Sequence, residues 1–208
     1  MTLEVGPLAD RVQSLLEERP RVLVGIVGAP GAGKSTLAEG LAAAARARGI
    51  PTAVVPMDGY HLADAALTAL GRLDRKGAID TFDGAGYIAL LERLRRGGER
   101  VWAPAFDRTI EQPIAGSIPV DLEVRLVVTE GNYLLSETEP WRRARTLLDE
   151  VWYVEIGDEE RLRRLVARHV AFGKDSAAAA QWVAVVDEPN ARMIAQTRSA
   201  AHLVVPGS

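Results

Sequence analysis

Residues 28–35 read Gly-Ala-Pro-Gly-Ala-Gly-Lys-Ser, the spacing of a loop that binds phosphate groups. Glycines let successive backbone N–H groups turn toward phosphate oxygens. At this spacing Lys34 is expected to reach the β- and γ-phosphates of a nucleotide, and the Ser35 hydroxyl to ligate Mg²⁺. The predicted nucleotide-binding residues are Gly28, Ala29, Pro30, Gly31, Ala32, Gly33, Lys34, Ser35 and Thr36. By itself this loop fits kinases, ATPases and nucleotide switches alike.

Two acids follow short aliphatic runs, Asp58 after "AVVPM" and Glu130 after "LVVT". If these runs are parallel strands, both carboxylates lie at the sheet edge where ligands bind. Asp58 is expected at the end of the strand beside the phosphate-loop strand, where it can accept the proton of a hydroxyl acceptor. Ser35 and Glu130 are predicted Mg²⁺ ligands. The alternatives are a simple Asp-Gly turn at Asp58 and an exposed acid at Glu130.

The elements that must position these residues alternate between strand and helix. Aliphatic runs predict strands at 21–28, 50–58, 124–131, 151–157 and 202–205. Helical spacing predicts helices at 10–19, 34–49, 87–97, 141–149, 158–171, from 176 onward and at 189–199. Between these elements, residues 102–113 read as a polar, aromatic loop. The pattern predicts a three-layer α/β fold with one parallel sheet flanked by helices.

The composition narrows the classes of protein. A chain of 208 residues with 48% hydrophobic residues can form one domain with a sizeable core. A net charge of −3 gives no bulk reason to expect nucleic acid or an anionic membrane as partner, and cysteine is absent. No segment approaches the ~20 apolar residues needed to span a bilayer, so a cytoplasmic protein is expected. Basic residues are almost all arginine, with lysine at Lys34, Lys76 and Lys174.

The chain resembles the phosphoribulokinase/uridine kinase family of P-loop kinases from about Val22 to Val205. The motifs that carry the resemblance are "GAPGAGKST", "PMDGYHL", "KGAIDTFD", "PAFDR" and "VVTEGNYLL". It is most similar to the bacterial branch labelled nucleoside/nucleotide kinase or fructose-transport-system kinase. The resemblance implies a P-loop NTPase fold, with ATP and Mg²⁺ as cofactors. It also implies that Asp58 is the general base and a third Mg²⁺ ligand beside Ser35 and Glu130, and that Glu130 lies near the metal and the acceptor. It also implies a single P-loop kinase domain over residues 1–208, with an acceptor-binding region at about 59–119 and a helical lid at about 158–175.

Several residues are expected to contact the acceptor. They are Asp58, Tyr60, His61, Asp83, Phe106, Arg108 and Glu130. Arg108 is expected to orient the substrate, with a solvated surface arginine as the alternative. His61 could bind substrate or cap a loop, and Asp83 could contact a substrate hydroxyl or cap a helix.

The predicted helix 158–171 carries four arginines, and the resemblance implies that it is a lid whose arginines neutralise the transferring phosphate. Guanidinium groups suit this task because they bind phosphate oxygens in pairs. Arg164 and Arg168 lie four residues apart on one helix face and are the expected catalytic arginines, together with Lys34 and Asp58. The alternative is a solvated helix face paired with the acids at 158–160, and "GKD" at 173–175 could act as the hinge.

Together these features predict an ATP-dependent kinase that transfers the γ-phosphate to a hydroxyl of a small molecule. Uridine/cytidine kinase and pantothenate-like kinase remain alternatives, although Gly59-Tyr60-His61 stands where uridine kinases typically carry Ser-Phe-Tyr. A different class is an ATPase or nucleotide switch without an acceptor, but a guanine-specific N/T-K-x-D segment is absent from the sequence. No nucleic-acid or membrane partner is expected, and a homodimer is left open.

Overall fold

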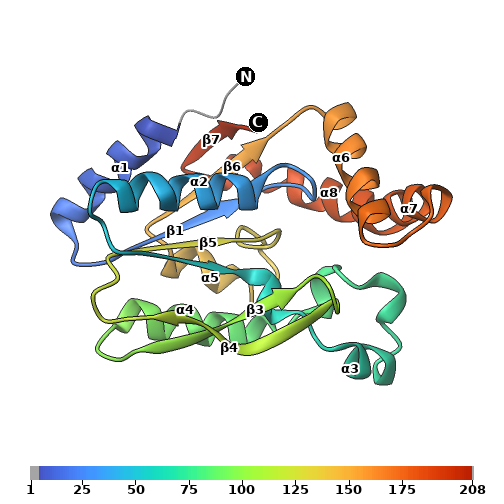
Figure 1. The fold of residues 1–208 in the computed structure, drawn as a ribbon, viewed down its shortest axis with the longest axis horizontal. Coiled ribbons are helices and arrows are strands. Elements are labelled where there is room, and N and C mark those ends of the chain that lie inside the picture. Colours follow the sequence, from blue (N-terminus) through green and yellow to red (C-terminus); the bar gives the residue numbers. More distant parts are fainter. Residues whose placement is uncertain (1–4, 208) are drawn as a thin grey trace.

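The computed structural model describes residues 5–207. Five strands form a parallel sheet in the order β2-β5-β1-β6-β7. Their bounds are β1 Val22–Val27, β2 Thr52–Pro56, β5 Leu126–Glu130, β6 Glu150–Glu155 and β7 Leu203–Pro206. Helices α1 (Val5–Glu18) and α2 (Lys34–Ala47) cover one face, and α4 (Gly84–Arg96) and α5 (Arg142–Leu147) cover the other (Figure 1). The predicted three-layer α/β fold is confirmed.

Strand β1 lies in the middle of the sheet, and every residue in it is buried. Val24 and Ile26 join the apolar cluster that contains residues of α1 and α2. Leu23 and Val27 point to the opposite cluster, which contains residues of α4 and α5. A strand buried on both faces needs a continuous aliphatic run, which explains why the sequence shows no polar alternation here.

Strand β5 lies between β1 and β2, so the expectation that the strand of Asp58 is beside the phosphate-loop strand is wrong. The register pairs Glu130 with Ile26 on one side and with Pro56 on the other. The crossover through α2 therefore skips one position in the sheet, and β5 occupies that position later in the chain. Two parallel strands joined by a helix need not be immediate neighbours. As a result, Glu130 lies between the phosphate loop and Asp58.

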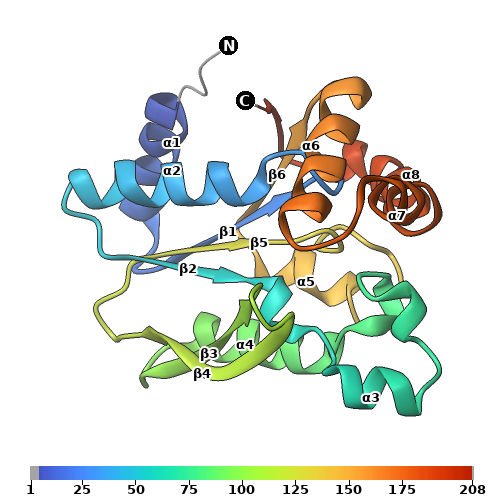
Figure 2. The ribbon, with the colours of Figure 1, turned by 45° about the vertical axis from the view of Figure 1, so that its right-hand side comes forward.

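Residues 102–113 were expected to form a loop, but most of them belong to a β-hairpin. Strands β3 (Val101–Asp107) and β4 (Gln112–Val120) pair antiparallel, with an irregularity between Ala103 and Ala105. Pro104 lies at this irregularity, one of the few places in a sheet that tolerates proline. The proline and the bulge interrupt the two-residue alternation of apolar and polar side chains, so the sequence did not indicate the hairpin. In Figure 2 the hairpin lies below the edge strand β2.

The rest of the insertion and the C-terminal helices lie at the carboxyl end of the sheet. The insertion contains three 3₁₀ turns and one helix: η1 Met57–Tyr60, α3 Asp64–Ala69, η2 Leu73–Arg75 and η3 Ile79–Thr81. The C-terminal part contains α6 Asp158–Ala171, α7 Ser176–Trp182, a π-helix at Val183–Asp187, α8 Glu188–Ala195 and η5 Arg198–Ala200. Helices α6 and α7 lie on the same side of the molecule as α3 (Figures 1 and 2). Within residues 5–207, no helix is long and apolar enough to cross a membrane.

Candidate active site

The loop of residues 28–35 connects β1 directly to α2. Gly33 has φ 94°, a left-handed backbone that favours glycine, and α2 begins at the next residue, Lys34. The Lys34 ammonium donates to the carbonyl oxygens of Gly28 and Ala29 at 2.9 and 3.1 Å. Burial lowers the pKa of Lys34 to about 8, although the nearby Glu130 acts to raise it. The ammonium is therefore held across the mouth of the loop that is expected to bind phosphate.

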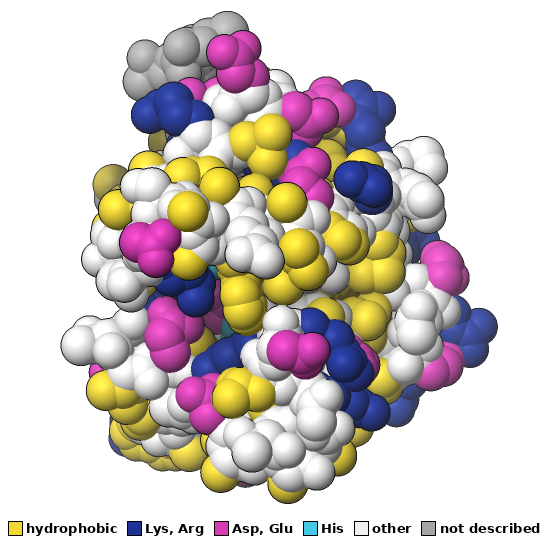
Figure 3. Space-filling model, turned by 90° about the vertical axis from the view of Figure 1, so that its right-hand side faces the viewer, with side chains coloured by type: hydrophobic (Ala, Val, Ile, Leu, Met, Phe, Trp, Pro, Cys, Tyr) yellow, Lys and Arg dark blue, Asp and Glu magenta, His cyan; other side chains and the backbone are white. Residues whose placement is uncertain are grey.

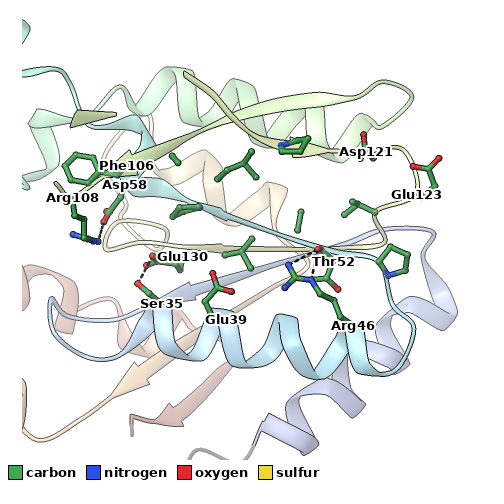
Figure 4. A pocket seen from close by; sticks show the side chains of 18 residues that line it. Ser35, Glu39, Arg46, Thr52, Asp58, Phe106, Arg108, Asp121, Glu123 and Glu130 are labelled. Atoms are coloured by element: carbon green, nitrogen blue, oxygen red, sulfur yellow. Dashed lines mark hydrogen bonds and ion pairs between the residues drawn. The ribbon is translucent and has the colours of Figure 1, made fainter. Parts of the chain in front are cut away.

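Glu130 lies next to the start of α2, where the Ser35 hydroxyl donates to its Oε1 at 2.9 Å (Figure 4). Burial raises the pKa of Glu130, and the neighbouring Asp58 raises it further. Within the described residues, no group of three or more His, Cys, Asp or Glu side chains gathers as a metal cluster. Two crowded carboxylates and a hydroxyl nevertheless fit Mg²⁺, which is usually held by one or two carboxylates together with phosphates and water.

Asp58 lies in the η1 turn just beyond β2. Its Oδ2 accepts a hydrogen bond from Arg108 Nη2 at 2.8 Å (Figure 4). Burial acts to raise the pKa of Asp58, but His61, Arg108 and Lys34 together outweigh burial and hold that pKa below its usual value. The carboxylate is thus charged at neutral pH and able to accept a proton.

The Asp58-Gly59 pair does more than form a turn. A Cβ added at Gly59 would lie 2.4 Å from the carbonyl oxygen of Pro104 on strand β3. Glycine therefore lets the hairpin pack closely on the turn that carries Asp58. This close approach brings the "PAFDR" segment, and with it Arg108, to the carboxylate.

His61 takes one of its two expected roles, that of holding a loop, and it also lines the cavity described below. Its Nδ1 lies 2.8 Å from the carbonyl oxygen of Asp58, so the ring helps to hold the turn. The ring also packs between Phe82 and Phe106, with centroid separations of 4.0 and 4.7 Å. Burial lowers the pKa of His61, although the neighbouring Asp58 acts to raise it.

These groups line one cavity of about 420 Å³. The predicted residues that it brings together are Pro30, Lys34, Ser35, Asp58, His61, Phe106, Arg108, Glu130 and Arg168. Figure 3 looks at this side of the molecule, where Lys, Arg, Asp and Glu side chains gather around the hollow. A second, open groove of about 720 Å³ shares Ser35, Asp58 and Glu130 and continues along the edge strand β2 (Figure 4).

Six residues of the predicted nucleotide-binding loop do not line this cavity: Gly28, Ala29, Gly31, Ala32, Gly33 and Thr36. Among the residues expected to act in catalysis or to contact the acceptor, three also lie outside its lining. Tyr60 packs edge-on against the buried Tyr87, with the ring centroids 5.5 Å apart. Asp83 is exposed, and its Oδ1 accepts a hydrogen bond from the backbone N–H of Gly86 at 2.8 Å, so Asp83 is the N-cap of α4. The structure thus shows a packing contact for Tyr60 and, for Asp83, helix capping, which was the alternative expected for it.

Arg164 is the third such residue. It pairs with Glu160 at 2.6 Å, and its Nη1 lies 3.9 Å from the position that a Cβ at Gly33 would take. It thus lies beside the phosphate loop, outside the set of residues that line the cavity, whereas Arg168 belongs to that set.

The sequence analysis missed several residues that line the cavity, among them Asp64, Lys76, Asn132, His169, Lys174 and Trp182. They come from short turns and from the ends of helices, where no periodic pattern points to a site. One signal was available: the chain has three lysines among its 25 basic residues, and all three line this cavity.

No family model matches the chain. An ATP-dependent kinase-like protein of Aspergillus versicolor is 38% identical over 162 residues, which cover 73% of this chain and 94% of that protein. A protein of Schizosaccharomyces pombe named as a uridine kinase is 35% identical over 176 residues, covering 80% of this chain and 74% of its own length. The chain belongs to the phosphoribulokinase/uridine kinase family of P-loop kinases.

A solved structure extends this family relationship to nearly the whole chain. A protein of Silicibacter sp. TM1040, named as a fructose transport system kinase, is 41% identical with a TM-score of 0.87. The match covers 99% of this chain and 100% of that protein. As a member of this family of P-loop kinases, the protein is an ATP-dependent kinase, a phosphotransferase with an alcohol group as acceptor.

Proposed function

We propose that the protein transfers the γ-phosphoryl group of ATP to a hydroxyl of a small molecule bound in the cavity, with Asp58 as general base. One observation carries the proposal: Lys34, Asp58 and Arg168 line the same cavity of about 420 Å³. In that cavity Lys34 would contact the donor phosphates, Asp58 would accept the proton, and Arg168 would neutralise the charge that develops on the transferring phosphoryl group. In this assignment residues 59–119 form the acceptor-binding region, and residues 158–175 form the lid.

The donor would bind at the loop of residues 28–36. The backbone N–H groups and the start of α2 would hold its phosphates, and Lys34 would turn from its carbonyl partners to the β- and γ-phosphates. Ser35, Glu130 and Asp58 would hold Mg²⁺, which would neutralise charge on the phosphates. The hydrogen bond of 2.9 Å between Ser35 and Glu130 supports a shared metal position for these two side chains.

The chemical step needs a charged carboxylate next to the acceptor hydroxyl. The hydroxyl oxygen would attack the γ-phosphorus, the bond from that phosphorus to the β–γ bridging oxygen would break to release ADP, and the hydroxyl proton would pass to Asp58. Arg108 occupies Oδ2 of Asp58, so the hydroxyl would approach through Oδ1. Because the pKa of Asp58 is lowered, its main contribution would be to orient the hydroxyl and to accept the proton late in the transfer.

The lid would supply the remaining positive charge. Arg168 lines the cavity directly, and we assign it to the transferring phosphoryl group. Arg164 would contact the donor phosphates only after leaving Glu160, with which it now pairs at 2.6 Å. Electrostatic stabilisation of this kind is usually the largest single contribution to phosphoryl transfer.

The test is the Asp58→Asn variant. Wild-type protein would be screened with ATP against nucleosides, pantothenate-like alcohols and sugars, with the mass of the phosphorylated product as readout. We expect Asp58→Asn to lower kcat by roughly 10²- to 10⁴-fold, the scale of general base catalysis, with ATP affinity nearly unchanged. Asp74→Asn is the matched control, since Asp74 is exposed and does not line the cavity. Unchanged turnover in Asp58→Asn would refute Asp58 as the base.

A further inference from the structure

The use of lysine in this chain points to a second anion in the active-site cavity. Lysine occupies three of the 25 Lys and Arg positions, and Lys34, Lys76 and Lys174 all line the cavity of about 420 Å³. Lys34 is explained by the donor phosphates. Lys76 lies in the acceptor-binding region and Lys174 in the turn of the lid, so neither belongs to the phosphate loop.

Lys76 is held in a fixed place on the cavity wall. Its ammonium pairs with Asp64 at 2.6 Å, and it also donates to the carbonyl oxygen of Glu111. Only 12% of its side chain is exposed. The Nζ atom lies 5.5 Å from the centroid of the Phe106 ring, on which the Arg108 guanidinium also rests, at 5.7 Å. Two cations thus meet at one aromatic ring, close to Asp58.

Lys174 reaches the cavity from the lid. It follows Gly173, whose φ of 97° turns the chain after α6. Its Nζ lies over the Trp182 ring, 4.5 Å from the centroid. No carboxylate forms an ion pair with Lys174 among residues 5–207, whereas Lys76 already has Asp64. An ammonium that faces a cavity without a carboxylate partner is available for an anionic ligand.

On the basis of the proposed function, we propose that the phosphate acceptor carries an anionic group, a carboxylate or a phosphate, in addition to its reactive hydroxyl. Lys76 and Lys174 bind this group from the acceptor-binding region and the lid, and Arg108 contributes from the hairpin. An uncharged alcohol would displace water from these cations without replacing the hydrogen bonds that the water makes to them. The uncompensated loss of hydration would weaken binding of such an alcohol. A compact ammonium on a flexible stem suits a small anion whose geometry is not planar.

Binding without turnover tests this proposal directly. The full-length protein would be loaded with Mg²⁺ and a non-hydrolysable ATP analogue, so that the phosphate loop is occupied, and titrated calorimetrically with ribose, ribonate and ribose 5-phosphate. We expect at least one of the two anions to bind clearly more tightly than ribose, and the comparison of ribonate with ribose 5-phosphate identifies a carboxylate or a phosphate. If neither anion binds more tightly than ribose, the proposal is wrong.

Substitutions locate the anion. Lys76→Met and Lys174→Met should each weaken binding of the preferred anion roughly 10- to 100-fold, the scale of one hydrogen bond to a charged group. Arg163→Met is the control on the lid helix, because Arg163 is exposed and pairs with Glu160. Circular dichroism would verify the fold of each variant. Anion binding that is unaltered in both lysine variants would overturn the assignment. This readout needs no turnover, so it can fail while the Asp58→Asn test succeeds, and the reverse also holds.

Discussion

Lys34 should make ATP binding depend on pH above neutrality. In the free protein, burial lowers the pKa of Lys34 to about 8. Bound phosphates favour the charged ammonium and therefore raise that pKa. Binding of ATP then takes up a proton at pH values above about 8, and by linkage the ATP affinity falls as the pH rises. The terminal phosphate of ATP contributes little to this pH dependence, because a phosphate group loses its second proton at about pH 6.

The magnitude follows from this pKa. With a pKa of about 8, about nine-tenths of Lys34 is charged at pH 7 and about one-tenth at pH 9. The association constant for ATP should therefore fall about tenfold between pH 7 and pH 9, with a limiting slope of one decade per pH unit. Glu130 acts to raise the pKa of Lys34, so Glu130→Gln should move the falling limb to lower pH.

The assay is a fluorescence titration with a labelled ATP analogue at constant ionic strength between pH 7 and pH 9.5. Lys34→Arg is the informative comparison, since guanidinium stays charged throughout this range. That variant should bind more weakly, because its geometry differs, but with an affinity independent of pH. A flat wild-type profile, or the same slope in Lys34→Arg, would refute the assignment of the pH dependence to Lys34.

Two further predictions concern the supports of the site. Arg161 is buried and pairs with Glu188 at 2.5 Å. Arg161→Met should therefore lower the free energy of unfolding, measured by urea denaturation, by about 2 kcal/mol. The exposed control, Arg163→Met, should change this free energy by less than about 0.5 kcal/mol. A Cβ at Gly131 would lie 2.5 Å from the Cβ of Met57, so Gly131→Ala should cost roughly 1–3 kcal/mol by overpacking, and a thermal midpoint equal to wild type would contradict this.

The sequence predicted the sheet well because buried parallel strands have a simple signature. Strands β1 and β5 are mostly aliphatic runs of six and five residues that end near a glycine or an acid, and both were located to within two residues. The helix 158–171 was predicted with its observed bounds. Strand order could not be predicted, because a βαβ crossover fixes direction and handedness but not how many positions it skips.

The structure brings together the predicted residues whose backbone a motif or a strand end fixes, but it separates from them Tyr60 and Asp83, which lie in a turn and at a helix start. Lys34, Ser35 and Glu130 follow from the loop and the strand end, whereas Tyr60 and Asp83 lie in a turn and at a helix start whose side-chain directions the sequence does not reveal. The hairpin was missed because Pro104 and the adjacent bulge break the alternation of β3. A local sequence pattern indicates which residues of one helix or strand are buried. The places of the hairpin and of the Tyr60 and Asp83 side chains depend instead on contacts between elements that are far apart in the sequence.

The strand order explains how one cavity could bind both the phosphate donor and the phosphate acceptor. β1 ends at the phosphate loop, β5 ends at Glu130, and β2 leads into the turn that carries Asp58. The phosphate loop, the proposed metal carboxylate Glu130 and the proposed base Asp58 therefore stand in one row across three neighbouring strands. If β2 had paired directly with β1, the strand that carries Glu130 would not separate Asp58 from the phosphate loop. Under the proposed function, the position of β5 would leave room for the γ-phosphate and the metal between donor and base. The hairpin packed on Gly59 would then enclose the acceptor from the far side.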